Sequence, residues 1–137
     1  MAAPGRAGGV PGRPGRAGHR QRLGTRGEQL AAAWYQARGY AVVARNWRCR
    51  EGELDLVVAR PGELVFCEVK TRSSHRFGTP AEAVTPAKQR RLRLLAARFL
   101  AGHDGGAGAP GRGGGRQVRF DVAAVTGGRV EVIEAAF

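Results

Sequence analysis

The sequence predicts an α/β sandwich in which helices flank a central mixed sheet. Two segments, near residues 25–39 and 85–102, carry apolar residues at helical spacing. Between and after them lie short segments with the alternation or the apolar runs that are typical of strands. The order is therefore helix, three strands, helix, then one or two strands. In such an order the strand after the second helix can return parallel to a strand already placed.

The first helix is expected to begin at Thr25-Arg26-Gly27-Glu28, which has the spacing of a capping box. Gly39 is expected to close it. In this position Glu28 acts as a capping acid that satisfies backbone N–H groups and meets the helix dipole. The apolar stripe of this helix is predicted at Leu30, Ala33, Trp34 and Ala37.

The three strands begin with residues 40–47, whose last part is both basic and aromatic. Trp47 could stack on an unpaired base, but a lone Trp at a strand end is expected to belong to the core. The next two strands, Glu53–Ala59 and Leu64–Thr71, form a hairpin around Arg60-Pro61-Gly62-Glu63, because Pro fixes its own φ and Gly permits a positive φ.

The second helix is predicted to open at Thr85-Pro86 and to end at Gly102. Its buried stripe is Leu92, Leu95, Ala96 and Phe99. Its other residues are strongly basic: Lys88, Arg90, Arg91, Arg93 and Arg98. A final pair of strands, Val118–Val125 and Arg129–Ile133, is expected around Gly127-Gly128. Asp121, within the first of these strands, is expected to be structural and to pair with a nearby arginine.

The chain of 137 residues is long enough for one domain with one modest core. Residues 1–23 are rich in Gly, Pro and Arg and are expected to be a disordered basic tail, followed by a domain at 24–137 with a flexible Gly-rich loop at 102–116. No apolar run is long enough to span a membrane, and no signal peptide or cysteine pattern points to an oxidising compartment. We expect a cytoplasmic protein without a membrane partner.

The net charge of +12 is concentrated in two segments. Residues 1–23 hold five arginines and no acid, and residues 24–101 hold fourteen basic and seven acidic groups. An excess of positive charge in the folded part suits a partner with a phosphate backbone, although a general arginine-rich composition gives the same excess.

Four charged residues interrupt the predicted hairpin. If its turn centres on Pro61-Gly62, Asp55 lies opposite Glu68 and Glu53 lies opposite Lys70, with opposed Cβ atoms about 4.5–5.5 Å apart. Two carboxylates this close repel unless a cation lies between them, and Mg²⁺ (or Mn²⁺) prefers oxygen ligands. A neighbouring lysine can orient an attacking water or neutralise charge on a phosphate. The alternative is an ion-paired strand end without catalytic function.

Asp55 followed by Glu68-Val69-Lys70 resembles the D…(D/E)-x-K motif of the restriction-endonuclease-like superfamily, which includes archaeal Holliday-junction resolvases. The longer runs 52–56 and 65–72, with further matches between Arg45-Asn46 and Phe137, resemble the YraN family of bacterial proteins. The resemblance covers most of residues 24–137. It implies a restriction-endonuclease-like three-layer sandwich with a central mixed sheet flanked by helices.

The resemblance also implies roles for individual residues. Asp55 and Glu68 would bind the metal ion, and Lys70 would be catalytic. Glu28 and the pair Lys88 and Gln89 stand where relatives place auxiliary residues. Phosphate contacts are expected from the loop after the second hairpin strand and from the second helix, at Arg72, Arg76, Lys88 and Arg91.

The leading hypothesis is therefore a Mg²⁺-dependent nuclease acting on DNA or structured nucleic acid. A non-catalytic nucleic-acid-binding or adaptor protein with the same fold is the first alternative. A small interaction domain with a structural salt-bridge cluster is the second. A homodimer would suit a substrate with two-fold symmetry, and the sequence reveals no dimer face.

Overall fold

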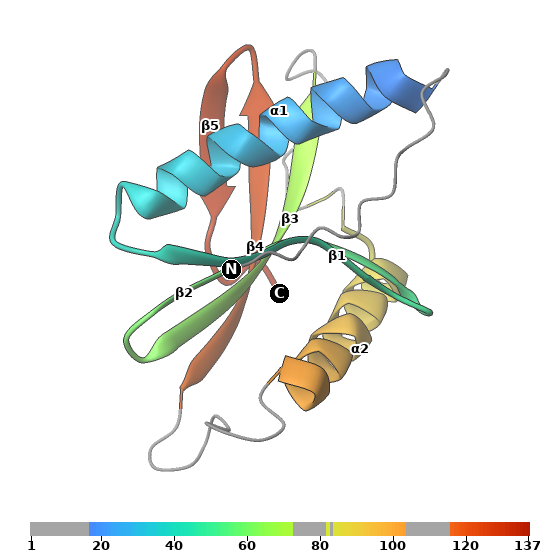
Figure 1. Cartoon of the computed structure of the whole chain (residues 1–137), viewed down its shortest axis with the longest axis vertical. Coiled ribbons are helices and arrows are strands. Elements are labelled where there is room, and N and C mark those ends of the chain that lie inside the picture. Colours follow the sequence, from blue (N-terminus) through green and yellow to red (C-terminus); the bar gives the residue numbers. More distant parts are fainter. Residues whose placement is uncertain (1–16, 73–81, 83, 104–115) are drawn as a thin grey trace, which may run out of the picture.

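The computed structural model describes residues 17–72, 82, 84–103 and 116–137, with the backbone alone for residues 17–25 and 103. Within these residues, two helices and five strands follow in the predicted order (Figure 1). They are α1 (Ala17–Gln36), β1 (Ala41–Cys49), β2 (Gly52–Arg60), β3 (Glu63–Arg72), α2 (Pro86–His103), β4 (Gln117–Thr126) and β5 (Arg129–Ile133).

The five strands form one mixed sheet in the order β1-β2-β3-β4-β5. Only β3 and β4 are parallel, and the other neighbouring strands are antiparallel. The connection between β3 and β4 contains α2, as a parallel pair requires. Separate buried clusters join α1 to one face of the sheet and α2 to the other. The predicted α/β sandwich with a mixed central sheet is confirmed.

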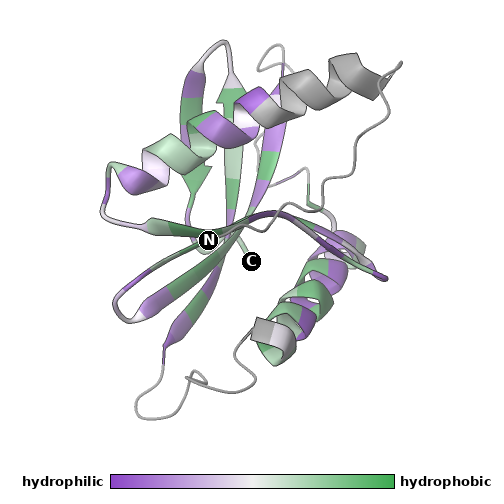
Figure 2. Cartoon of the chain, in the orientation of Figure 1, coloured by the Kyte–Doolittle hydropathy of each residue, from purple (hydrophilic) through white to green (hydrophobic). Residues whose placement is uncertain are grey.

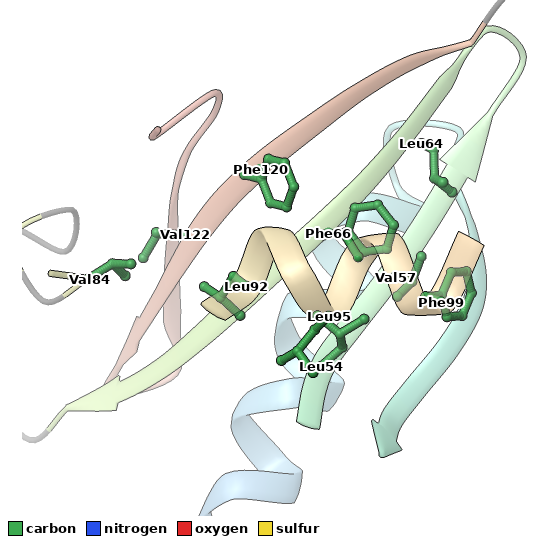
Figure 3. Close-up of a cluster of buried hydrophobic side chains, with 11 residues drawn as sticks. Leu54, Val57, Leu64, Phe66, Val84, Leu92, Leu95, Phe99, Phe120 and Val122 are labelled. Carbon is green, nitrogen blue, oxygen red and sulfur yellow. The ribbon is translucent and has the colours of Figure 1, made fainter. Parts of the chain in front are cut away.

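The core between α2 and the sheet is the larger of the two clusters. Its α2 residues are the predicted stripe Leu92, Leu95, Ala96 and Phe99, all of which are buried. They pack on side chains from β2, β3 and β4, and Figure 3 shows Phe66 and Phe120 beside the helix. The default expectation for Trp47 is also confirmed, because its ring packs edge-on against Phe99 with centroids 5.4 Å apart. Figure 2 shows hydrophobic residues alternating with hydrophilic ones along α2.

The core between α1 and the sheet corrects the predicted stripe of the first helix. Ala31, Ala32 and Tyr35 are buried, whereas Ala33 and Ala37 are exposed. The buried face is therefore displaced from the predicted one. Hydrophobic spacing alone does not distinguish these faces, because alanines occur on both. Tyr35 determines the outcome, since its hydroxyl donates a 2.6 Å hydrogen bond to the buried Asp121.

The start of α1 was also predicted incorrectly. The helix begins at Ala17 rather than at Thr25, so residues 17–23 are helical and do not belong to an irregular tail. The segment Arg20-Gln21-Arg22-Leu23 consists of good helix formers, which extend the helix beyond the capping signal. Residues 1–16 lie outside the described residues.

The hairpin of β2 and β3 has the predicted register over the part next to its turn, but the expected pairs Asp55–Glu68 and Glu53–Lys70 are not part of the ladder. The paired residues run from Arg60 and Glu63 at the turn to Leu56 and Cys67. Gly62 adopts a φ of 82°, as the turn required. Cys67 is buried on the α1 side of the sheet.

The C-terminal elements also agree with the prediction. The Thr85 hydroxyl accepts a 3.2 Å hydrogen bond from the N–H of Lys88, which caps α2. The helix includes Gly102 and ends at His103. Most of the expected loop at 102–116 lies outside the described residues. The final strands β4 and β5 form the expected hairpin around Gly127-Gly128.

Asp121 is fully buried and has a structural role, as predicted. Its carboxylate accepts hydrogen bonds from the guanidinium of Arg119 at 2.8 and 2.9 Å and from the N–H of Ala135 at 3.0 Å. With Tyr35, these donors satisfy a charge that would otherwise be costly to bury. Neither helix in the described ranges is long and apolar enough to cross a membrane.

Candidate active site

The regular alternation of side chains is interrupted in β1 and β2 at the same level. On a regular strand, side chains two residues apart point to the same face. On β2, however, Leu54 packs toward α2 and Leu56 packs toward α1, while Val57 packs toward α2. Asp55 lies at this interruption. On β1, Asn46 lies between the pairs Arg45–Leu56 and Trp47–Leu54, and it has a left-handed φ of 48°. Residues of this kind cluster at functional sites, so the interruption directs attention to Asp55.

Asp55 lies just beyond the last pair of the β2–β3 ladder, Leu56 and Cys67. Its Oδ2 atom accepts a 2.9 Å hydrogen bond from the backbone N–H of Val69. A side chain therefore replaces the next backbone contact between the strands. This bond fixes the Asp55 carboxylate between the two strands, beside Glu68.

Glu68 is 8% exposed and contacts two lysines through the same oxygen. The Nζ of Lys70 on β3 lies 3.2 Å from Glu68 Oε2, and the Nζ of Lys88 on α2 lies 3.0 Å from it. The predicted proximity of Glu68 and Lys70 is thus present. The sequence placed Lys88 among the phosphate contacts and auxiliary residues, and the structure brings it into the same cluster.

A cavity of about 220 Å³ lies between these strands and α2. It is lined by Glu53, Asp55, Glu68, Lys88 and Arg91, with Gly52, Leu92 and Leu95. Glu53 shares the cavity with the other two carboxylates, but its ion pair is a 3.8 Å contact with Arg48. The expectation that Glu53 lies opposite Lys70 needs correction, because the β2–β3 ladder ends at Leu56 and Cys67, before either residue.

The electrostatics of the cluster are dominated by burial. Burial and, after it, the charge of Glu68 together raise the pKa of the Asp55 carboxyl to about 7, against the hydrogen bond from Val69. Burial lowers the pKa of the Lys88 ammonium, but its contacts with Lys70 and Glu68 outweigh this effect, so its pKa lies above the usual value. The protein thus holds a carboxyl group that changes charge near neutral pH beside a fixed positive charge.

Glu28 belongs to this cluster, and the preferred capping role is wrong. It lies in the interior of α1, because the helix begins at Ala17. Burial raises the pKa of its carboxyl, a hydrogen bond with the Asn46 side chain lowers it, and the nearby charges of Glu53 and Glu68 raise it again. The auxiliary role implied by the resemblance is therefore the one that its position suits.

The other predicted site residues lie around the cluster or outside the described chain. Gln89 donates a 3.0 Å hydrogen bond from its side-chain amide to the carbonyl of Val84, which gives it a structural partner. Arg72 ends β3 and lines a separate cavity described below. Arg76 lies outside the described residues.

The sequence analysis missed the contribution of Asn46 to the site. Its left-handed backbone and its hydrogen bond to Glu28 connect β1, α1 and the carboxylate cluster. The signal was an Asn inside a strand, where this residue type is disfavoured but tolerates a positive φ.

The carboxylates of the cluster are possible ligands of a Mg²⁺ ion. Across the described residues, no three His, Cys, Asp or Glu side chains are grouped closely enough to hold an ion. Mg²⁺ is commonly bound by one or two carboxylates together with waters and substrate phosphates, so Asp55 and Glu68 fit that requirement. The N–H and C=O of one strand residue point to the same side, so the Val69 carbonyl also faces the Asp55 side.

The structure is that of an α/β protein with a buried acid–lysine site. The carboxylates and lysines of this site gather where β2 and β3 of the mixed sheet cease to pair. Residues 27–125 match the model of the family described as "Uncharacterised protein family UPF0102". The chain belongs to this family, which is the YraN family whose resemblance was noted in the sequence.

Individual relatives extend the match to most of the chain. A UPF0102 protein of Beutenbergia cavernae is 59% identical over 104 residues, which cover 75% of this chain and 80% of the relative. One from Frankia alni is 51% identical over 120 residues, covering 84% of this chain and 93% of the relative. One from Symbiobacterium thermophilum is 57% identical over 81 residues, covering 59% and 69%. These names carry no activity, so function is argued from the site.

Proposed function

We propose that this protein is a metal-dependent nuclease with a restriction-endonuclease-like fold, hydrolysing phosphodiester bonds in DNA or structured nucleic acid. The observation that carries the proposal is the meeting of Asp55 and Glu68 from adjacent strands, with Lys70 and Lys88 on the same Glu68 oxygen. Carboxylates and a lysine in this arrangement suit phosphodiester hydrolysis better than they suit a packed core.

Each residue of the cluster has a role in this proposal. Asp55 and Glu68 would hold Mg²⁺ or Mn²⁺, with the Val69 carbonyl as a further oxygen ligand. When bound, the ion would supply Lewis-acid stabilisation of the phosphate and a more acidic water. Lys70 would hold the attacking water by a hydrogen bond and offset negative charge that develops on the phosphate. Glu28 and Glu53 would accept hydrogen bonds from water near the ion.

Positive charge around the cavity would bind the rest of the substrate. Arg91 lines the cavity and is exposed on α2. Phosphate contacts of this kind position a nucleic acid without reading its sequence. They support a nucleic-acid substrate, with DNA as the first choice.

The ion pairs of Glu68 also support a second candidate. Two ammonium groups beside one carboxylate already balance its charge, as in a structural ion-pair network. The protein would then be a non-catalytic nucleic-acid-binding or adaptor protein that retains the fold. Cleavage separates this candidate from the nuclease.

The test is cleavage of labelled linear, flapped, single-stranded and four-way-junction DNAs and a structured RNA with Mg²⁺ or Mn²⁺. We expect the wild-type protein to cut at least one of these substrates. Asp55→Asn and Lys70→Met should each reduce the rate by about 100-fold or more, since each removes a group required in the transition state. Glu51→Gln is the matched control, because Glu51 pairs with Arg98 and does not line the cavity.

Binding without cleavage on the whole panel would support the adaptor protein. Cleavage that Asp55→Asn leaves unchanged would place the activity elsewhere or in a contaminant. Neither binding nor cleavage would leave the cluster as a structural ion-pair network.

A further inference from the structure

A second and larger cavity lies at the end of β3. Its volume is about 550 Å³, which is within the usual range for a small-molecule or cofactor site. Arg26 and Leu30 of α1 line one wall, and Thr71 and Arg72 of β3 line another. Val125 and the Gly127-Gly128 turn between β4 and β5 complete the described lining.

The lining combines two guanidinium groups with apolar side chains. Arg26 and Arg72 come from different elements, and Leu30 and Val125 supply apolar surface. No acidic residue is among the described residues that line this cavity. A ligand that complements such a lining has a flat or apolar part and a negative charge, because guanidinium groups bind phosphates and also stack on rings.

The position of this cavity connects it to the proposed catalytic site. Thr71 and Arg72 directly follow Lys70 on β3, and residues two apart on a strand are separated by about 7 Å. The wall depends on Gly27, because a Cβ at this position would collide with the Thr71 hydroxyl. Close packing of α1 on the end of β3 therefore places this cavity on the α1 side of the sheet, at the end of β3 that carries Lys70, whereas the acid–lysine cavity lies on the α2 side.

We propose that this cavity binds one unpaired nucleotide of the nucleic acid, with its phosphate at Arg26 and Arg72 and its base against Leu30 and Val125. The proposal rests on the proposed function and specifies its substrate class. A base inside a duplex is stacked and paired, so only a single-stranded, flapped or flipped-out nucleotide can enter such a cavity. The preferred substrate would thus have an unpaired nucleotide near the bond that is cut.

The test uses binding of thymidine 5′-monophosphate to the full chain in EDTA, followed by NMR, with thymidine and inorganic phosphate as separate ligands. The monophosphate should bind with a Kd of about 1 mM or tighter and about tenfold more tightly than either fragment. Arg26→Glu should weaken its binding by about tenfold, because it reverses one charge at the cavity. Leu30→Trp should weaken it similarly by filling the cavity.

Arg90→Glu is the matched control, because it makes the same change of net charge on the exposed face of α2. It should change the Kd by less than about twofold. Equal weakening by Arg90→Glu and Arg26→Glu would overturn the proposal, as would inorganic phosphate binding as tightly as the monophosphate or no binding by the wild type. Circular dichroism verifies that each variant is folded, and Arg26→Glu alters only an exposed side chain.

These outcomes are independent of catalysis, because the measurement contains no divalent ion. If the protein cleaves DNA but does not bind the monophosphate, only the proposal that this cavity binds a nucleotide is refuted. If the protein cuts no substrate but binds the monophosphate, and Arg26→Glu weakens that binding, the nucleotide-binding proposal stands and the nuclease proposal is refuted.

Discussion

The backbone N–H of Val69 donates a 2.9 Å hydrogen bond to the Asp55 carboxylate. This bond is important because of its position in the fold, just beyond the last pair of the β2–β3 ladder. The two strands remain joined there, but through a carboxylate that keeps a second oxygen for another partner. This hydrogen bond therefore joins β2 to β3 and also orients the Asp55 carboxylate at the site.

The raised pKa of Asp55 predicts a pH-dependent stability. Its folded-state pKa is about 7, above the ordinary value of 3.8, so the folded protein binds this proton more tightly than the unfolded chain. The stability that protonated Asp55 provides is fully present below about pH 4 and is lost as the pH rises through 7. In EDTA, the advantage of Asp55→Asn over the wild type should grow from pH 5 to pH 8 by about 2–4 kcal/mol in urea unfolding. A difference that stays constant over this range would contradict the assignment.

The coupling between Asp55 and Glu68 predicts a directional change in pKa. After burial, the charge of Glu68 is the main cause that raises the pKa of Asp55. Glu68→Gln removes this charge and leaves Lys70 and Lys88 beside Asp55, so the pKa of Asp55 should fall by about one unit or more. Titration of the Asp55 carboxyl carbon by NMR measures this value.

Glu53→Gln serves as the comparison for that titration. Glu53 affects the pKa of Asp55 less than Glu68 does, so its replacement should produce a smaller fall. An equal or larger fall with Glu53→Gln would show that Glu53, rather than Glu68, is the main charged neighbour.

The contact between Gly27 and Thr71 predicts that a side chain larger than that of glycine does not fit at this position of α1. Gly27→Ala should lower the free energy of unfolding by about 1–3 kcal/mol, because the added Cβ meets the Thr71 hydroxyl. The double variant with Thr71→Ala should recover much of this loss. Gly102→Ala on α2 is the control, since its Cβ meets nothing within 4 Å. It should leave stability unchanged or raise it by up to about 1 kcal/mol, and an equal loss at both glycines would refute the steric argument.

The conformation of Asn46 predicts different effects for two substitutions. Asn46→Gly keeps the left-handed backbone and removes the hydrogen bond to Glu28, so the pKa of Glu28 should rise. Asn46→Ala removes the same bond and adds the cost of a Cβ at positive φ, so it should be less stable than Asn46→Gly by about 1 kcal/mol. Urea unfolding of the two variants measures this difference. Equal stabilities would mean that the backbone at this position relaxes.

Much of the fold could be predicted because local signals and burial agreed. Pro61-Gly62 marked the turn and the hairpin register as far as Leu56 and Cys67, next to Asp55 and Glu68. Thr85-Pro86 marked the start of α2, and the apolar residues of α2 occur at one clear helical spacing. At these positions the turn, the cap and the core each favour the same structure.

The remainder depended on contacts between segments distant in sequence. The buried face of α1 is set by Tyr35 with Asp121, and its close approach to the sheet is set by Gly27 with Thr71. No local pattern identifies these partners. The hydrogen bond between Glu28 and Asn46 also joins distant segments. The ion pair of Lys88 with Glu68 does so too, although the resemblance had implied an auxiliary role for Lys88. The interruption of β1 and β2 at Asn46 and Asp55 has no counterpart in the hydrophobic pattern either.

The central claim is that Asp55 and Glu68 form a divalent-ion site, and the most direct test is Mn²⁺ binding measured by electron paramagnetic resonance at pH 8. We predict one bound ion in the wild type and at least about tenfold weaker binding in Asp55→Asn, because one of two carboxylate ligands is lost. Glu51→Gln, whose acid pairs with Arg98, should bind as the wild type does. Equal Mn²⁺ binding by all three proteins, or none by the wild type, would contradict the claim.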